Sequence, residues 1–160
     1  MKPDWQQKLA LFLSLFLALN VYAENLHDID NIEQVAYEHA LKKAVESFEN
    51  PQVVMGDLDS RLRLQACESS LDAFSNFVNT GLGSQTVGVK CNQPVQWTVY
   101  VPVQIKVFQH VVVTSKPLAA NKVITASDVK VKLWDIASLR QGYLSNIKDV
   151  IGQELKTPLA

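Results

Sequence analysis

The chain has 160 residues, of which 48% are hydrophobic and 19% are charged, and it contains only six glycines and six prolines. This composition is too apolar for an intrinsically disordered chain and excludes collagen-like and linker-type sequences. The formal net charge of −1 gives no indication of nucleic-acid binding, which usually requires a strongly basic surface. The length fits one domain or two small ones.

The first 23 residues have the pattern of a secretory signal peptide. Lys2 and Lys8 precede an apolar run over residues 9–19. As a helix this run would span about 16 Å, far less than the roughly 30 Å of a bilayer core. The pattern predicts export by the general secretory route and cleavage between Ala23 and Glu24. No later stretch approaches 18 apolar residues, so we expect a mature protein that does not span a membrane.

The two cysteines, Cys67 and Cys91, both lie in the predicted mature chain. In an oxidising compartment a single disulfide is the default expectation. A metal site would need further ligands, and none of the three histidines stands at a recognised metal-site spacing from a cysteine. A nucleophilic cysteine would need a free thiol. We therefore expect a disulfide, with no metal or cofactor.

Charge divides the mature chain unevenly. Residues 24–60 carry nine acidic and two basic side chains, a net charge of −7. Residues 61–160 carry six acidic and eleven basic side chains, a net charge of +5. We expect a solvated acidic helix beside a mildly basic β region; the alternative is a surface that steers a charged partner.

A helix is predicted in the acidic part. Asp30 and Glu33 resemble a capping box, and Asn50-Pro51 is expected to end the element. Because its apolar residues recur at helical spacing, the helix needs a sheet or another helix to cover them. The stripe comprises Ile32, Val35, Ala36, Ala40, Leu41, Ala44, Val45 and Phe48.

From residue 52 the hydrophobic spacing changes to a period of two, which predicts strands. We expect strands at 52–58, 61–64, 86–91 and 96–108, with a loop over 68–85. One face of the longest strand carries Trp97, Val99, Val101, Val103, Ile105 and Val107. Pro102 lies on its other face, which predicts an edge strand or a bulge. Residues 24–109 are thus expected to form an α+β domain, with the N-terminal helix packed on a small, mainly antiparallel sheet.

A second, β-rich domain is predicted over residues 110–160. Its turn at 117–121 contains Asn121, which tolerates a positive φ. A polar corner at 125–128 then leads into a strand at 129–133. Lys130 and Lys132 lie on one side of this strand, where paired lysines usually protect an edge. They are also our candidate partner-binding residues.

The sequence contains no recognisable catalytic constellation. It has no Walker A motif and no nucleophile elbow, and Gly81-Leu82-Gly83 leads into a strand rather than a helix. Asp57 and Asp59 would point to opposite faces of a strand, which argues against shared acid-base work. We expect His39 to be solvated on the helix surface. The sequence therefore predicts a protein that acts by binding and is not an enzyme.

Two stretches of the chain together resemble a known family. The first comprises LDSRLRLQAC at 58–67, TVGVKC at 86–91 and WTVYVPV at 97–103, and the second is PLAANKVITASDVKVKLWDI at 117–136. In this order they resemble the periplasmic flagellar P-ring assembly chaperone family. The second stretch also resembles the start of a SAF domain, a β-clip module.

The resemblance implies a non-enzymatic periplasmic protein that escorts the flagellar P-ring subunit and promotes ring assembly around the rod. It also implies that Cys67 and Cys91 correspond to the paired cysteines of the family. Family members continue beyond the last residue of this sequence, so we expect a truncated chain with an incomplete SAF-like domain. They also commonly have glycine where this chain has Asn121.

The SAF likeness implies an alternative function. The chain would be a carbohydrate- or cell-wall-binding module without catalysis, with Trp134 or Tyr143 stacking on sugars. Against this alternative, we expect both aromatic side chains to pack in the core.

Overall fold

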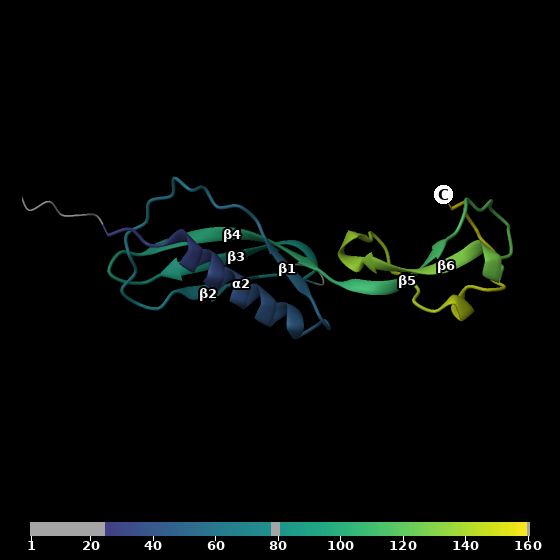
Figure 1. Ribbon diagram of the computed structural model, residues 1–160, viewed down its shortest axis with the longest axis horizontal. Coiled ribbons are helices and arrows are strands. Elements are labelled where there is room, and N and C mark those ends of the chain that lie inside the picture. Colours follow the sequence, from purple (N-terminus) through teal and green to yellow (C-terminus); the bar gives the residue numbers. More distant parts are fainter. Residues whose placement is uncertain (1–24, 78–80, 160) are drawn as a thin grey trace, which may run out of the picture.

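The computed structural model describes residues 25–77 and 81–159, which form two units joined end to end (Figure 1). The predicted signal peptide over residues 1–23, and its cleavage site between Ala23 and Glu24, lie outside the described residues. Within the described part of the chain, no helix combines the length and the apolar character needed to cross a membrane.

Helix α2 (Ile29–Val45) begins and ends earlier than predicted. Asp28, not Asp30, caps it, because the Asp28 carboxylate accepts a 3.1 Å hydrogen bond from the backbone N–H of Asp30. The backbone of Asp28 is still extended, as a capping residue requires, so the predicted cap was two residues too late. Phe48 lies beyond the helix, in a turn in which its N–H donates a hydrogen bond to the carbonyl of Ala44.

The buried face of α2 is narrow. Its buried residues are Ile32, Ala36, Ala40 and Ala44. This spacing of four puts them on one side of the helix, and three small alanines let the helix axis lie close to the sheet. The predicted stripe was too wide, because Val45 is 53% exposed.

The helix packs on a four-stranded antiparallel sheet (Figure 1). The strands are β1 (Gln52–Met55), β2 (Asp72–Phe74), β3 (Gly83–Cys91) and β4 (Trp97–Lys106), in the order β1-β4-β3-β2. Burial alternates along β4 as predicted, with Val99, Val101, Val103 and Ile105 buried. The predicted α+β fold, one helix on an antiparallel sheet, is confirmed.

Several predicted strands differ from the observed ones. β1 ends at Met55 rather than at residue 58, and β3 begins at Gly83 rather than at residue 86. Residues 61–64 form no strand, since a turn at Asp59–Leu62 redirects the chain. The predicted loop at 68–85 contains β2, whose three residues are too few to show a period. The predicted strand at 96–108 is interrupted at Val107, where β4 ends and β5 (Phe108–Thr114) begins in a second sheet.

Pro102 lies in a central strand, not at an edge or a bulge. Its carbonyl accepts a 2.8 Å hydrogen bond from the N–H of Gly56, just past the end of β1. The backbone nitrogen and the carbonyl of one strand residue point to the same side of the strand. The nitrogen of Pro102 therefore faces Gly56 and not β3, and its missing N–H costs no hydrogen bond to β3. A Cβ on Gly56 would lie 2.7 Å from Cγ of Pro102, so only glycine fits here.

The second unit is built on a hairpin of β5 and β6 (Val129–Asp135). Short isolated bridges, Leu118 with Leu159 and Val123 with Glu154, tie the rest of the chain to it. Its buried hydrophobic residues are few: Val111, Leu118, Ile124 and Val129. Asn121 adopts a φ of 61°, so the predicted turn is confirmed without glycine. The predicted boundary between the two domains, at residues 109/110, falls within β5 and stays a prediction.

Replacing Ile32 by alanine tests the helix–sheet interface. The side chain is fully buried, so Ile32→Ala is expected to lower the free energy of unfolding by about 2–5 kcal/mol through lost burial and a new cavity. Urea denaturation followed by circular dichroism measures this change. Val45→Ala, on the exposed side of the same helix, is the control and should stay within about 0.5 kcal/mol of the wild type. Equal effects of the two changes would contradict the assigned helix face.

Candidate protein-interaction surface

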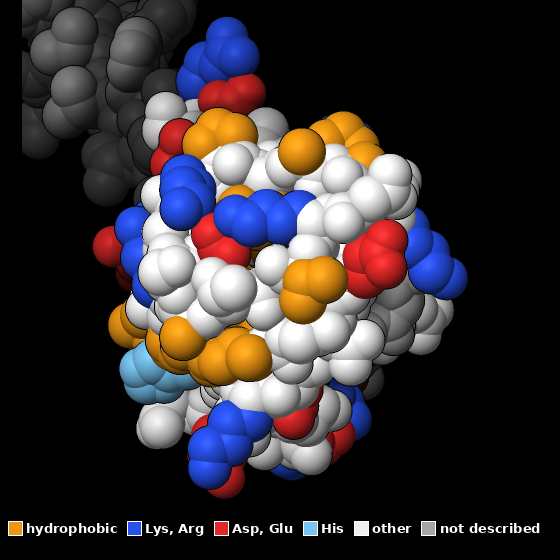
Figure 2. Space-filling model, turned by 90° about the vertical axis from the view of Figure 1, so that its right-hand side faces the viewer, with side chains coloured by type: hydrophobic (Ala, Val, Ile, Leu, Met, Phe, Trp, Pro, Cys, Tyr) orange, Lys and Arg blue, Asp and Glu red, His pale blue; other side chains and the backbone are white. Residues whose placement is uncertain are grey.

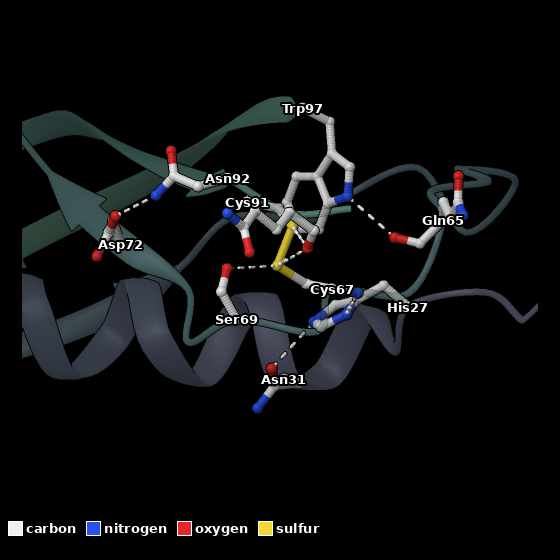
Figure 3. Close-up of a disulfide and its surroundings, with 10 residues drawn as sticks. His27, Asn31, Gln65, Cys67, Ser69, Asp72, Cys91, Asn92 and Trp97 are labelled. Carbon is white, nitrogen blue, oxygen red and sulfur yellow. Dashed lines mark hydrogen bonds between the residues drawn. A yellow bond between two sulfur atoms is a disulfide. The ribbon is translucent and has the colours of Figure 1, made fainter. Parts of the chain in front are cut away.

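A disulfide joins Cys67 to Cys91, with a Cα–Cα distance of 5.8 Å (Figure 3). His27 lies beside it and links three parts of the first unit. Its Nδ1 accepts a 3.1 Å hydrogen bond from the backbone N–H of Cys67, and its Nε2 lies 3.0 Å from Oδ1 of Asn31 on α2. Its ring packs at 5.3 Å from that of Trp97 on β4. With both nitrogens engaged in hydrogen bonds, His27 has a structural role.

The disulfide and Trp97 together fix a segment without regular structure. Between β1 and β2 the chain runs from 56 to 71 with only one isolated bridge, Leu26 to Gln65. The indole N–H of Trp97 donates a 3.0 Å hydrogen bond to the carbonyl of Gln65. Four leucines of this segment pack on the core: Leu58, Leu62, Leu64 and Leu71.

Removing the disulfide is therefore expected to destabilise the first unit. The bond closes a loop over a sequence separation of 24, and the double variant Cys67→Ser/Cys91→Ser should lose about 3.5 kcal/mol of unfolding free energy, through the greater entropy of its unfolded chain. Urea denaturation with and without dithiothreitol measures this. The reductant should destabilise the wild type and leave the double variant unchanged; a reductant effect on the double variant would show that the loss has another source.

The described residues offer no assembled catalytic centre. No three histidine, cysteine, aspartate or glutamate side chains of these residues lie close enough to hold a metal ion. His39 was expected to be solvated, but it is half-buried, and its Nε2 lies 2.9 Å from Oγ of Ser75. Burial, followed by the charges of Lys43 and Lys42, lowers the pKa of His39. Asp59 is held by exposed Arg61 in a 2.9 Å ion pair.

The polar corner before β6 is organised around one buried carboxylate. Asp128 is only 1% exposed. Its Oδ1 lies 2.6 Å from Nζ of Lys122 and 3.2 Å from Nζ of Lys116. Its Oδ2 accepts hydrogen bonds from the N–H and the hydroxyl of Thr125, at 3.1 and 2.7 Å. Four groups thus fix the corner, and they hold the pKa of Asp128 well below its usual range, with the Lys122 hydrogen bond the largest cause.

The lowered pKa of Asp128 predicts a pH dependence of stability. A depressed pKa means that the carboxylate stabilises the fold above its unfolded pKa of about 4, and that this stabilisation is lost as the pH falls towards the folded value. Asp128→Asn is therefore expected to destabilise the protein at neutral pH, with a difference from the wild type that shrinks below about pH 4. Thermal unfolding from pH 3 to 7 measures it. Asp149→Asn, at an exposed carboxylate of the same unit, should show no such difference.

The candidate residues Lys130 and Lys132 both lie exposed on β6. The Lys132 Nζ lies 4.4 Å from the ring centroid of Trp134, which is two residues along the strand and on the same face. Trp134 and Tyr143 are partly exposed, so their predicted core positions were wrong. Because the Lys132 ammonium covers one face of the Trp134 ring, that face is not free to stack on a sugar.

An apolar groove of about 600 Å³ runs beside the hairpin in the second unit. Val111, Val113, Ile124 and Leu155 contribute to its lining. The end of this unit displays basic side chains and small separate hydrophobic patches (Figure 2). Nothing in the structure shows what covers the groove.

The bare face of the first sheet carries an aromatic pair that the sequence reasoning missed. Phe74 on β2 and Tyr100 on β4 meet edge to face, with ring centroids 6.3 Å apart. Gly88 on β3 lies beneath the Phe74 ring, and a Cβ at Gly88 would collide with that ring. The role of Asp128 was also missed, although the spacing Thr125-x-x-Asp128 before a strand matches a capping pattern.

Comparison with known proteins assigns the family. A family model described as the FlgA N-terminal domain matches residues 32–107. A second model, described as a chaperone for flagella basal body P-ring formation, matches residues 109–160. Together the two cover well over half of the chain. The chain belongs to the family of flagellar basal-body P-ring formation chaperones, a family of non-catalytic assembly factors.

Three solved structures are similar in outline. The crystal structure of flagellar protein FlgA from Thermotoga maritima is 12% identical, with a TM-score of 0.49, and the match covers 82% of this chain and 48% of that one. Salmonella FlgA is 15% identical in a closed form (TM-score 0.44) and in an open form (0.41). Each Salmonella match covers 81% of this chain, and 63% and 61% of the respective FlgA chains. This chain thus spans about half to two thirds of their length. A search of curated proteins finds no match.

Proposed function

We propose that this protein acts in the periplasm as a chaperone that binds flagellar P-ring subunits and promotes their assembly around the rod. The observation that carries the proposal is the match of both family models, in order, along residues 32–107 and 109–160. A chaperone of this kind acts by contact. The described residues accordingly offer exposed strand edges and apolar surface rather than a cluster of catalytic groups.

The proposed location rests on two further observations. The sequence of residues 1–23 has the pattern of a signal peptide for the general secretory route. The Cys67–Cys91 disulfide is of the kind that persists in oxidising compartments such as the bacterial periplasm. We therefore expect the functional form to begin at Glu24.

Co-purification from the periplasm tests the proposal. The tagged full-length gene product, expressed in its own bacterium, should appear in the periplasmic fraction with Glu24 as its first residue, as read by N-terminal sequencing. After gentle crosslinking it should carry the P-ring subunit with it. Deleting its gene should abolish swimming, and plasmid-borne expression should restore it.

The control for this experiment is a variant that lacks residues 2–23 and so should stay in the cytoplasm. It should neither crosslink to the ring subunit nor restore swimming. Absence of the subunit from the crosslinked wild-type sample, together with normal swimming of the deletion strain, would overturn the proposed function.

A further inference from the structure

The outer edge of β6 has backbone groups that no other strand among residues 25–77 and 81–159 pairs with. The N–H of Ile136 donates to the carbonyl of Val107, and the N–H of Ser115 donates to the carbonyl of Asp128, so these pairs close the β5–β6 ladder at its two ends. Hydrogen-bonded pairs alternate along an antiparallel ladder. By this alternation the backbone N–H and carbonyl groups of Lys130 and Lys132 bond to β5. The backbone N–H and carbonyl groups of Val131 and Leu133 point away from β5.

The two edges of the hairpin differ. On the β5 side, the outward N–H of Val112 donates a 2.8 Å hydrogen bond to the carbonyl of Leu144, so a later segment lies against that edge. On the β6 side, no hydrogen bond within the described residues reaches the outward groups of Val131 and Leu133. The free edge of β6 therefore presents a donor and an acceptor at alternate residues.

Length also distinguishes β6 from the edge strands of the first sheet. β1 has four residues and β2 has three, and such short edges pair poorly with another chain. β6 has seven residues, of which the central five, 130–134, are exposed. Asp128 fixes the corner at its start through Lys122, Lys116 and Thr125, so this edge is held in position before any partner arrives.

The side chains along β6 indicate what kind of strand would pair with it. Lys130 and Lys132 project from one face, and Val131 and Leu133 project from the other, with 43% and 56% of their surface exposed. Residues of a paired strand alternate in the same way, so a partner with acidic side chains on one face and apolar side chains on the other is complementary. The same lysines repel the β6 edge of a second copy, which disfavours self-pairing.

We propose that the free edge of β6 binds an extended segment of the P-ring subunit, with alternating acidic and apolar residues, by adding it as a third strand to the β5–β6 hairpin. This inference rests on the proposed function, since it takes the ring subunit as the partner. Backbone hydrogen bonds to Val131 and Leu133 supply affinity, and Lys130 and Lys132 select the acidic segment.

Proline at position 131 tests the backbone part of the proposal. Proline removes the outward N–H and places its ring on the free edge, while the bonds of Lys130 and Lys132 to β5 remain. Val131→Pro is expected to weaken binding of the purified P-ring subunit at least about tenfold, as measured by biolayer interferometry. Val131→Ala is the matched control, because it shortens the same side chain and keeps the N–H. It should bind clearly more tightly than Val131→Pro.

Charge reversal tests the side-chain part. Lys130→Glu/Lys132→Glu is expected to weaken binding at least about tenfold at low salt. The control, Lys148→Glu/Lys156→Glu, makes the same change in net charge at exposed lysines of the same unit and should stay within about twofold of the wild type. Circular dichroism and thermal unfolding of every variant establish that it is folded.

Hydrogen exchange on the unmutated protein gives a readout that does not depend on any variant folding. The amides of Val131 and Leu133 should exchange fast in the free protein and become protected when the subunit binds. The amides of Lys130 and Lys132, already bonded to β5, should be protected in both states.

The outcomes separate this inference from the function on which it rests. If the wild type does not bind the subunit at all, the proposed function fails. If the wild type binds but Val131→Pro binds equally well, or the amides of Val131 and Leu133 gain no protection, the β6 edge is not the binding site while the chaperone function stands. A wild-type dimer in analytical ultracentrifugation that Val131→Pro dissociates would make a second copy the occupant, and this too would overturn the proposal.

Discussion

The first unit depends on the covalent link between Cys67 and Cys91. Helix α2 contributes mostly alanines to the core, so much of the remaining cover of the sheet comes from the leucines of residues 56–71. This segment lies in no strand; its backbone is held at one isolated bridge, Leu26 with Gln65, through hydrogen bonds from His27 N–H to the Leu64 carbonyl and from Ala66 N–H to the Asn25 carbonyl. The disulfide anchors its far end to β3, and the Trp97–Gln65 hydrogen bond anchors it to β4. The disulfide thus helps to hold the leucines of this segment against the sheet, as a second helix would cover the sheet in a larger domain.

In the second unit, electrostatic interactions stabilise the fold where the hydrophobic core is small. This unit has few buried hydrophobic residues, and the buried carboxylate of Asp128 gathers two lysines and a threonine around the start of β6. One carboxylate that accepts from several charged and polar donors orients a strand without a large core. The result is a hairpin that is held firmly at the start of β6, while the outer edge of β6 is unpaired within the described part of the chain. Such an edge is suited to contact with another chain.

The sequence predicted the elements whose hydrophobic pattern repeats over many residues, and it missed those too short to show a repeat. The helix, β4 and the alternation of Val99, Val101 and Val103 were all predictable, because each repeats its pattern over several residues. The position of the helix cap was not, because Asp28 and Asp30 are chemically equivalent and only the backbone conformation decides between them. β2 was too short to show a pattern. The free edge of β6 could be suspected from Lys130 and Lys132, but its unpaired groups follow only from the ladder register.

The contact between Phe74 and Gly88 limits how this sheet can vary. The two residues face each other in the β2–β3 register, and the aromatic ring occupies the volume that any side chain at 88 would need. A larger residue at 88 is therefore compatible with the fold only when 74 becomes smaller, so the two positions should change together among relatives. Tyr100, which rests edge-on against Phe74, would then lose its neighbour. One missing Cβ thus ties together the identities of residues on three strands.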